Sequence, residues 1–464
     1  MFRKHMIFSL GGIALCLMML AVGLMMSGPG HSHAASSLGS ARTPSISHQL
    51  AQPFDAVQGN IYYGTGSTSV YALDAQTGAQ LWVYPLQCGN GMNFFTVLWV
   101  VNGIAYVNTC NPSCLSHLAA IRGSDGTQLW CSTFTFFAPG ANGTRFLGVS
   151  QGIVYLYTVI PGGDGGEHDT LHALNATDGS LLWSYDQNPQ IPDQFLDFFK
   201  VVQGVAYISM DQYNPAGGGP YLTCALNTSS GSVNWCAANA LTSILAQGVL
   251  YATNSTSLIA LRASDGSQLW SYAGSFDQIV AHPKVVFVGG PGSLCALNSS
   301  NGSQRWCSSV NAYHFFVQGG IIYAGGQAFS ASTGALLWTN QAANIIGLGQ
   351  SVVYALTGGY YVEEINAMSG SLLWSYSIAQ SGTASFSPGD GVIYYNTPHG
   401  LRALSASTGT LLWSHFTTSN AILSFQSDSS AIAYVVSNNT TTNSFTLHAY
   451  NASNGTLLWQ YAMP

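Results

Sequence analysis

Ten of the eleven tryptophans in this chain end close variants of one thirteen-residue stretch, of which LHALNATDGSLLW at residues 171–183 is an example. They are Trp82, Trp130, Trp183, Trp235, Trp270, Trp306, Trp338, Trp374, Trp413 and Trp459. Their spacing runs from 32 to 53 residues and averages about 42. That period is expected of four-stranded propeller blades and exceeds the usual helical-repeat length of about 33 residues.

Each copy predicts a β-hairpin. Its first half alternates apolar and polar residues, which is the period of a strand. A glycine stands four residues before every repeated tryptophan, and the residue before that glycine is Asp, Asn, Ser or Thr. Such a pair suits a turn in which glycine takes a positive φ. The glycines are Gly78, Gly126, Gly179, Gly231, Gly266, Gly302, Gly334, Gly370, Gly409 and Gly455.

A second signature lies upstream of each hairpin. There an apolar triplet ends in an aromatic residue, often after a turn pair such as Gln203-Gly204, and another short apolar run precedes that turn. Each unit therefore contains four strands and two tight turns, and no segment sustains a capped helical pattern. The aromatic residues are Tyr62, Tyr106, Tyr155, Tyr207, Tyr251, Phe287, Tyr323, Tyr354, Tyr394 and Tyr434.

These units predict an all-β chain, a β-propeller of four-stranded blades. One blade cannot bury both of its faces alone, so blades stack around an axis and cover one another. A tryptophan has the size and flatness to fill the seam between neighbouring blades. Because it recurs in every unit, packing is favoured over a cofactor-stacking role.

The repeated pattern Ala-Leu-x-Ala-x-[Thr/Ser/Asp]-Gly-x-x-Leu-Trp resembles the pyrroloquinoline quinone (PQQ) repeat across residues 46–464. Propellers with that repeat include the quinoprotein alcohol dehydrogenases and the non-catalytic propeller lipoprotein of the bacterial outer-membrane assembly machinery. The resemblance implies the fold, and it leaves enzyme and scaffold open because the family contains both. Relatives usually close with seven or eight blades. Ten units therefore form either one wide ring or a smaller ring with extra blades.

The N-terminus predicts the compartment. Residues 6–26 carry no charge and follow Arg3 and Lys4. Twenty-one apolar residues are long enough to span a bilayer as a helix, yet Ser32-His33-Ala34 offers a cleavage site. Both interpretations place the rest of the chain outside the cytoplasm. The expected divisions are a signal peptide or membrane anchor at 1–34, a short linker at 35–45 and the propeller at 46–464.

The charge balance excludes one class of partner. The chain has 10 basic and 17 acidic residues, and without Arg3 and Lys4 the balance is 8 − 17 = −9. No cluster of Lys or Arg occurs, so nothing supports nucleic-acid binding. Charged residues make up 6% of the chain, but 47% apolar content and the strict periodicity indicate a packed fold.

Two cysteine pairs predict disulfides. Cys224 and Cys236 are twelve residues apart, as are Cys295 and Cys307. Each pair occupies matching positions on the two strands of a repeat hairpin, where opposed residues lie about 4.5–5.5 Å apart. We expect both bridges to form in an oxidising compartment, with pairs of buried free thiols as the alternative.

Four further cysteines follow the apolar segment: Cys88, Cys110, Cys114 and Cys131. They allow three pairings. We favour Cys110–Cys114 together with Cys88–Cys131. A zinc site is the competing use, but no second pair or regularly spaced histidine supports it.

Long connections indicate where binding would occur. In a four-stranded blade, the turns between strands one and two and between strands three and four share one face, which we call the turn face. The other connections share the opposite face, the loop face. Long loops on a rigid scaffold commonly carry binding, so the loop face of units 1–4 is the candidate site, with neutral surface variation as the alternative. Its insertions are residues 83–96, 110–117, 132–145, 161–170, 184–198 and 211–221.

One of these loops, residues 161–170, is rich in acidic groups. Asp164, Glu167 and Asp169, with His168 beside them, are candidate metal ligands because calcium binds six to eight oxygens. Their spacing matches neither an EF-hand loop nor a glycine-aspartate nonapeptide repeat. A solvated polar loop is therefore the favoured interpretation, and no metal site is predicted.

The residues that quinoprotein dehydrogenases require are not recognisable. Those enzymes use calcium ligands, a catalytic Asp, a tryptophan floor beneath the quinone and often an adjacent Cys pair, and no Cys-Cys occurs in this chain. Asp197, Asp211 and Asp277 are expected near a channel mouth without a partner base or ligand set. We therefore predict no catalytic or cofactor-binding residue. PQQ and calcium belong to the dehydrogenase alternative. Four other carboxylates fall in repeat turns on the turn face: Asp74, Asp125, Asp178 and Asp265.

The predicted function is a non-catalytic binding or assembly scaffold outside the cytoplasm, with a protein or glycan partner at the loop face of units 1–4. It would be secreted, or held in the membrane by residues 6–26 if that segment stays uncleaved. One alternative is a quinone-dependent dehydrogenase of an alcohol or sugar. Another is a glycan-binding propeller that uses Trp99, Phe136, Phe137 or Tyr213.

Overall fold

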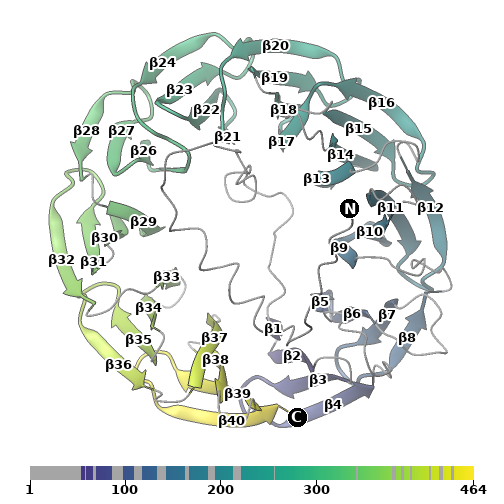
Figure 1. Cartoon of the computed structure of the whole chain (residues 1–464), viewed down its shortest axis with the longest axis vertical. Coiled ribbons are helices and arrows are strands. Elements are labelled where there is room, and N and C mark those ends of the chain that lie inside the picture. Colours follow the sequence, from purple (N-terminus) through teal and green to yellow (C-terminus); the bar gives the residue numbers. More distant parts are fainter. Residues whose placement is uncertain are drawn as a thin grey trace, which may run out of the picture.

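Ten separate antiparallel sheets, each of four consecutive strands, follow one another around a ring in the computed structural model (Figure 1). The described residues form strands and their connections, which confirms the all-β prediction. The ten units form a single ten-bladed propeller, which rules out a smaller ring with extra blades. Within the described residues no helix is long and apolar enough to cross a membrane. The structure describes residues 54–57, 59–65, 69–85, 98–108, 118–132, 143–161, 167–186, 194–212, 221–254, 256–340, 343–358, 360–378, 383–387, 391–397, 400–416, 420–427, 432–439 and 444–463.

Each blade runs from an inner first strand, beside the central axis, to an outer fourth strand at the rim (Figure 1). The strands of blades 1 to 5 are β1 (Phe54–Val57), β2 (Asn60–Thr65), β3 (Ser69–Asp74), β4 (Gln80–Pro85); β5 (Leu98–Val101), β6 (Ile104–Asn108), β7 (Leu118–Arg122), β8 (Gln128–Cys131); β9 (Gly143–Ser150), β10 (Ile153–Pro161), β11 (Glu167–Asn175), β12 (Leu181–Tyr185); β13 (Gln194–Val202), β14 (Val205–Gln212), β15 (Leu222–Asn227), β16 (Val233–Ala238); β17 (Leu241–Ala246), β18 (Val249–Thr253), β19 (Ser257–Arg262) and β20 (Gln268–Ala273).

Blades 6 to 10 repeat this order. Their strands are β21 (Gln278–Ala281), β22 (Val285–Gly290), β23 (Ser293–Asn298), β24 (Gln304–Ser308); β25 (Phe315–Gln318), β26 (Ile321–Ala324), β27 (Gln327–Ser330), β28 (Leu336–Thr339); β29 (Ala343–Leu348), β30 (Val352–Thr357), β31 (Tyr361–Asn366), β32 (Leu372–Ser377); β33 (Thr383–Ser387), β34 (Val392–Thr397), β35 (Gly400–Ser405), β36 (Leu411–Phe416); β37 (Asn420–Ser427), β38 (Ile432–Asn439), β39 (Ser444–Asn451) and β40 (Leu457–Met463).

The two tight turns of each unit take the backbone conformations that their residues favour. Asn102 and Gly103, between β5 and β6, have φ values of +52° and +74°. Positive φ at both central residues matches the right-handed twist of the flanking strands. In the second turn, all ten glycines that stand four residues before the tryptophans have φ between +67° and +72°. The turns therefore form where the sequence predicts them.

A β-bulge precedes every repeated tryptophan. In blade 3, Ala173 lies opposite Trp183 and Leu174 lies opposite Leu181, so Leu182 has no partner in the ladder. The same register shift occurs in all ten blades. A bulge bends the strand and turns the extra residue outward, and Leu182 is accordingly exposed.

The tryptophans occupy the seams between blades. Trp270 of blade 5 donates from Nε1 to the carbonyl oxygen of Ser299 in blade 6 at 2.9 Å, and a Cβ on Gly302 would lie 2.5 Å from its ring. All ten seams repeat this contact, with N–O distances from 2.7 to 3.3 Å. Inside each blade the second-strand aromatic lies 5.9 to 6.4 Å from the tryptophan, between ring centroids.

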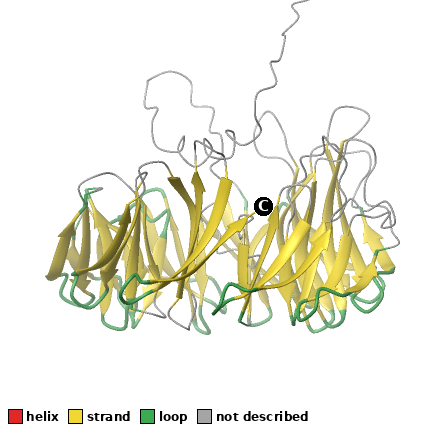
Figure 2. Cartoon of the chain, turned by 90° about the horizontal axis from the view of Figure 1, so that it is seen from below, coloured by secondary structure: helices red, strands yellow, loops and turns green. Residues whose placement is uncertain are grey.

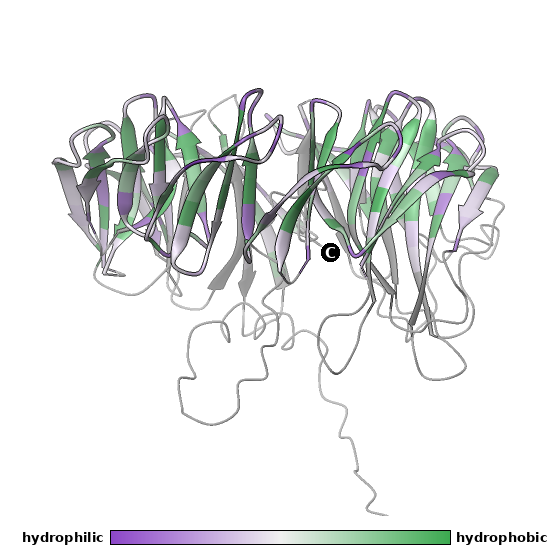
Figure 3. Ribbon diagram, turned by 90° about the horizontal axis from the view of Figure 1, so that it is seen from above, coloured by the Kyte–Doolittle hydropathy of each residue, from purple (hydrophilic) through white to green (hydrophobic). Residues whose placement is uncertain are grey.

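Hydrophobic residues concentrate in the strands and hydrophilic residues in the turns (Figure 3). The buried apolar side chains form clusters between neighbouring blades. The ring closes through a seam of the same kind. Trp459 of blade 10 donates from Nε1 to Ala75 O of blade 1 at 3.1 Å, and the Tyr434 hydroxyl donates to the same oxygen at 3.2 Å. Among the described strands, none is shared between the first and last blades. Side-chain packing and side-chain hydrogen bonds therefore join the two ends of the ring.

Candidate functional site

The two faces of the ring differ in their connections. The short turns lie together on one face, the turn face (Figure 2), and the strand ends on the opposite side define the loop face. Asp265 shows what the turn-face carboxylates do: its Oδ1 accepts hydrogen bonds from the Ser267 hydroxyl at 2.6 Å and the Ser267 backbone N–H at 2.9 Å. These bonds lower the pKa of the Asp265 carboxyl. Asp125 and Asp178 accept the backbone N–H two residues on in the same way. Asp74, at the start of its turn, accepts from the backbone N–H and the hydroxyl of Thr77, each at 2.8 Å.

Blades 3, 4 and 10 have the longest strands; in blade 10, β37, β38 and β39 have eight residues each. The second strand has nine residues in blade 3 (β10) and four in blade 7 (β26). In blade 4, β13 has nine residues and β14 has eight. At roughly 3.4 Å per residue, five extra residues add about 17 Å of strand. The extensions lie at the loop-face end. Blades 3 and 4 are neighbours in the ring and form one continuous raised wall there, whereas blade 10 rises separately.

The predicted binding loops themselves fall mostly outside the described residues. What the structure does place is the set of strand ends from which they start: β10 ends at Pro161, β11 begins at Glu167 and β14 ends at Gln212. All three ends are on the loop face. Phe136, Phe137 and Tyr213 lie outside the described residues, whereas Trp99 stacks on Phe146 with ring centroids 5.5 Å apart.

The candidate metal ligands are only partly placed. Asp164 lies outside the described residues. Glu167 and Asp169 belong to β11, where they pair in register with Pro161 and Val159. Within the described part of the chain, no group of three or more His, Cys, Asp or Glu side chains gathers around a point. Calcium binding by this loop stays a hypothesis.

The residues that would hold a calcium-bound quinone do not come together in the described ranges. Asp277 directly precedes β21, and its Oδ2 is buried without a hydrogen-bond partner. Asp197 and Asp211 lie in β13 and β14. Calcium takes six to eight oxygen ligands, with carboxylates prominent among them, and in the described ranges Asp277 belongs to no group of three or more His, Cys, Asp or Glu side chains.

Both twelve-residue cysteine pairs are disulfides. Cys224–Cys236 joins β15 to β16, and Cys295–Cys307 joins β23 to β24, each with a Cα–Cα distance of 4.1 Å. An aromatic hydroxyl from the preceding blade lies 3.6 Å from one sulfur of each bridge. Cys131 is also disulfide-bonded. Cys88, Cys110 and Cys114 lie outside the described residues, so the favoured pairing of these four stays a prediction.

Histidine 172 forms a hydrogen-bonded chain across three strands that sequence inspection missed. Its Nδ1 lies 2.8 Å from the Ser184 hydroxyl and its Nε2 lies 2.9 Å from the Thr158 hydroxyl. Burial lowers the pKa of His172 to about 4, so the ring is neutral at physiological pH. The sequence signal was its place in the repeat. His172 stands directly before the alanine that lies opposite the tryptophan, at the position of Cys224 and Cys295 in other blades.

Glu364 is a second residue that was missed. In nine blades an alanine lies opposite the tryptophan, but in blade 8 Glu364 lies opposite Trp374. Its side chain is buried, one carboxyl oxygen accepts a hydrogen bond from the Tyr354 hydroxyl at 3.1 Å, and burial raises its pKa. In the sequence, Glu364 is recognisable because it replaces the alanine that the other nine repeats have at this position.

Comparison with known proteins gives a family and several distant folds. The family model described as outer membrane protein assembly factor BamB matches residues 35–272, 167–315 and 327–464. The structure of BamB from Moraxella catarrhalis is similar at 17% identity, covering 68% of this chain and 95% of that one, with a TM-score of 0.39. Quinohemoprotein alcohol dehydrogenase ADHIIG from Pseudomonas putida HK5 is similar at 13% identity, covering 79% and 66%, with a TM-score of 0.34. A search of curated proteins gives no match.

Proposed function

The chain belongs to the family described as outer membrane protein assembly factor BamB, and on that premise we propose that it is a non-catalytic scaffold outside the cytoplasm. It binds a protein partner through the loop face of blades 1–4. The observation that carries this proposal is the raised wall of blades 3 and 4, where strands of eight and nine residues replace the four-residue strands of blade 7.

Cross-blade hydrogen bonds support this wall as a rigid platform. The Tyr157 hydroxyl of blade 3 accepts from the Leu196 backbone N–H of blade 4 at 2.9 Å. On the other side of blade 4, the Ser209 hydroxyl oxygen accepts from the Thr242 backbone N–H of blade 5 at 2.9 Å. Loops that start from fixed strand ends lose less conformational freedom on binding, which favours affinity.

The two described disulfide pairs and the family support a location outside the cytoplasm, because such bridges persist in oxidising compartments. Residues 1–34, proposed as a signal peptide or anchor, lie outside the described residues. We expect the partner to be a protein. A glycan bound at the same loop face is the alternative.

Site-specific photo-crosslinking in cells tests the proposal. A photoreactive amino acid at Gln194 or Gln212, both at loop-face strand ends, is expected to form an adduct of one defined mass with an envelope protein. The same group at Thr77, on the turn face, is the matched control and is expected to form none. Adducts from Thr77 alone, or from no position, would contradict the proposed surface.

A loop graft sharpens that test. Blade 6 joins its second and third strands through Pro291-Gly292 alone, between Gly290 and Ser293. Replacing residues 213–220 of blade 4 with Pro-Gly is expected to abolish the Gln212 adduct while leaving the melting temperature unchanged. Dye reduction by the full-length chain with added PQQ and calcium would instead support the dehydrogenase alternative.

A further inference from the structure

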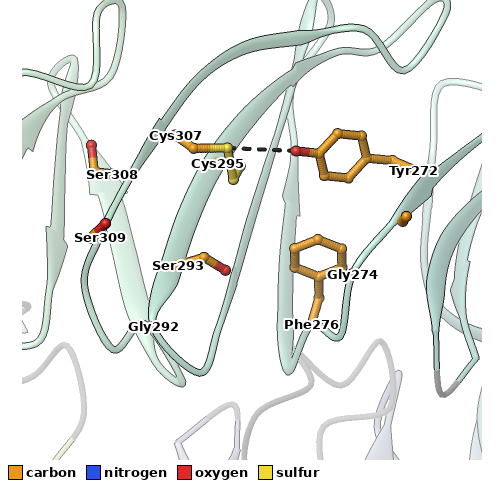
Figure 4. A pocket seen from close by; sticks show the side chains of 10 residues that line it. Tyr272, Gly274, Phe276, Gly292, Ser293, Cys295, Cys307, Ser308 and Ser309 are labelled. Atoms are coloured by element: carbon orange, nitrogen blue, oxygen red, sulfur yellow. Dashed lines mark hydrogen bonds between the residues drawn. A yellow bond between two sulfur atoms is a disulfide. The ribbon is translucent and has the colours of Figure 1, made fainter.

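A pocket of about 280 Å³ lies in the seam between blades 5 and 6, near its loop-face end (Figure 4). Tyr272 and Phe276 of blade 5 form one side, and Ser293, Ser309 and the Cys295–Cys307 disulfide of blade 6 lie across from them. Its volume is close to the lower end for small-molecule sites, about 300 Å³. Blade 5 separates this seam from the wall of blades 3 and 4.

The pocket exists because blade 6 has no insertion above it. The two-residue connection Pro291-Gly292 leaves the loop-face end of β23 uncovered. On the blade 5 side, a Cβ on Gly274 would lie 2.5 Å from Phe276 Cζ, so glycine at this position allows the Phe276 ring to fold back against the link. The short turn and the glycine together leave an open concave surface.

Backbone hydrogen bonds fix the walls. The Asp277 N–H donates to Gly289 O at 2.8 Å, which ties the link from blade 5 to β22. The Gly292 N–H donates to Asn311 Oδ1 at 2.8 Å, and the Ala312 N–H donates to Gly290 O at 3.0 Å. The disulfide holds the two strands behind the pocket. The pocket is therefore formed before a ligand arrives.

The residues that line the pocket are uncharged, with aromatic rings on one side and serine hydroxyls on the other. The Tyr272 and Phe276 rings are 5.9 Å apart with an interplanar angle of 30°. The Tyr272 hydroxyl donates to Gln304 Oε1 at 2.6 Å. The part of Tyr272 that a ligand would contact is therefore its aromatic ring. Across from the rings, Ser293 and Ser309 line the pocket, and each side-chain hydroxyl can both donate and accept a hydrogen bond.

We propose that this pocket binds one hexopyranose ring, either as a free sugar or as a unit of a glycan. A pyranose has an apolar C–H face that packs on an aromatic ring and an edge of hydroxyls that bonds to serines. An anionic ligand would find no cation among the lining residues. A wholly apolar ligand would bury the two serine hydroxyls without partners, which is unfavourable. This proposal is independent of protein binding at blades 1–4.

Saturation-transfer NMR on the full-length chain tests it with glucose, galactose, mannose and N-acetylglucosamine as probes. At least one is expected to bind with a millimolar dissociation constant. Phe276→Leu removes the aromatic surface and is expected to weaken binding about fivefold. Ser309→Ala removes one hydroxyl at an exposed position, with a loss of similar size. Phe316→Leu, at an exposed phenylalanine of β25 outside the pocket, is the matched control and is expected to leave binding unchanged.

The possible results distinguish binding from misfolding. If Phe276→Leu lowers the melting temperature, Ser309→Ala still tests the pocket, because it changes only one exposed hydroxyl. No transfer to any probe at about 10 mM, tenfold above a millimolar dissociation constant, would overturn the proposal. Binding that survives both pocket variants would also overturn it. Tighter binding of a tetrasaccharide than of its monosaccharide identifies a glycan chain as the ligand, and equal affinity identifies the free sugar.

Discussion

The turn face and the loop face show how one repeat serves two purposes. On the turn face, every seam repeats the same contact between a tryptophan, a carbonyl oxygen and a glycine of the next blade, with N–O distances of 2.7 to 3.3 Å. On the loop face, the second strand varies from four residues in β26 to nine in β10. Because the seam contacts lie toward the turn face, the loop face is free to vary without opening the ring.

The largest predicted loss of folding stability comes from replacing a glycine of blade 5. Two glycines of that blade separate the cost of a steric clash from the cost of backbone strain. Gly266 has φ +71° and a Cβ there would lie 2.4 Å from the Trp235 ring, whereas Gly248 has φ +75° and open space around it. Gly266→Ala is expected to lower the free energy of unfolding by about 4 kcal/mol, because overpacking and backbone strain act together. Gly248→Ala is expected to cost about 1 kcal/mol, from strain alone. Urea unfolding measures both.

Equal losses in these two variants would show that the seam tolerates a methyl group. In that case the glycine would be required for its φ alone, and the tryptophan contact would carry less of the ring's stability than the geometry indicates.

The next effect is a pH dependence at His172 in blade 3. The unfolded chain has a histidine pKa near 6.5, and burial lowers the folded value to about 4. The unfolded state therefore takes up a proton first as pH falls. The stabilisation is complete above pH 6.5 and is lost progressively down to about pH 4, with a total near 3 kcal/mol.

His172→Gln isolates this contribution, because His448 also has a lowered pKa and titrates in the wild type. The difference in unfolding free energy between wild type and variant is expected to shrink as pH falls from 6.5 to 4. A difference that stays constant over that interval would mean that His172 is not buried as a neutral ring.

A smaller effect is expected from deleting one seam hydrogen bond. Trp270→Phe keeps an aromatic ring but leaves the Ser299 carbonyl oxygen without the Nε1 donor, a loss of about 2 kcal/mol. Trp99 is the one tryptophan outside the repeat and stacks on Phe146, so Trp99→Phe is the matched control with a loss below about 1 kcal/mol. Thermal melting distinguishes them, and the opposite order would contradict the assigned role of the repeated tryptophans.

The smallest effect is a gain in stability. Glu364→Ala restores in blade 8 the residue that the other nine blades place opposite the tryptophan. Burial raises the pKa of Glu364, so its ionisation costs stability as pH rises through the folded pKa. The variant is expected to be more stable by about 1 kcal/mol at pH 8, with a smaller gain at pH 4. A gain independent of pH would assign the effect to packing.

Much of the candidate site was within reach of sequence reasoning, and specific parts were not. The position of the loop face and the disulfides Cys224–Cys236 and Cys295–Cys307 followed from the hairpin pattern, because residues opposed in a hairpin are set by the turn between them. The contacts of His172 with Thr158 and Ser184 involve side chains on three strands, and no periodicity reports them. The pocket beside Phe276 depends on two separate blades and was equally hidden.

The sequence by itself determined the unit: alternating strands, glycine turns with positive φ, and one tryptophan in each of ten copies. These features are local, since each depends on residues a few positions apart. The tertiary structure alone decided that the copies form one ring. Closure brings Trp459 to Ala75 across 384 residues of sequence, and it requires the angle between neighbouring blades to repeat ten times. That angle results from the packing of side chains in the seams, which local pattern does not encode.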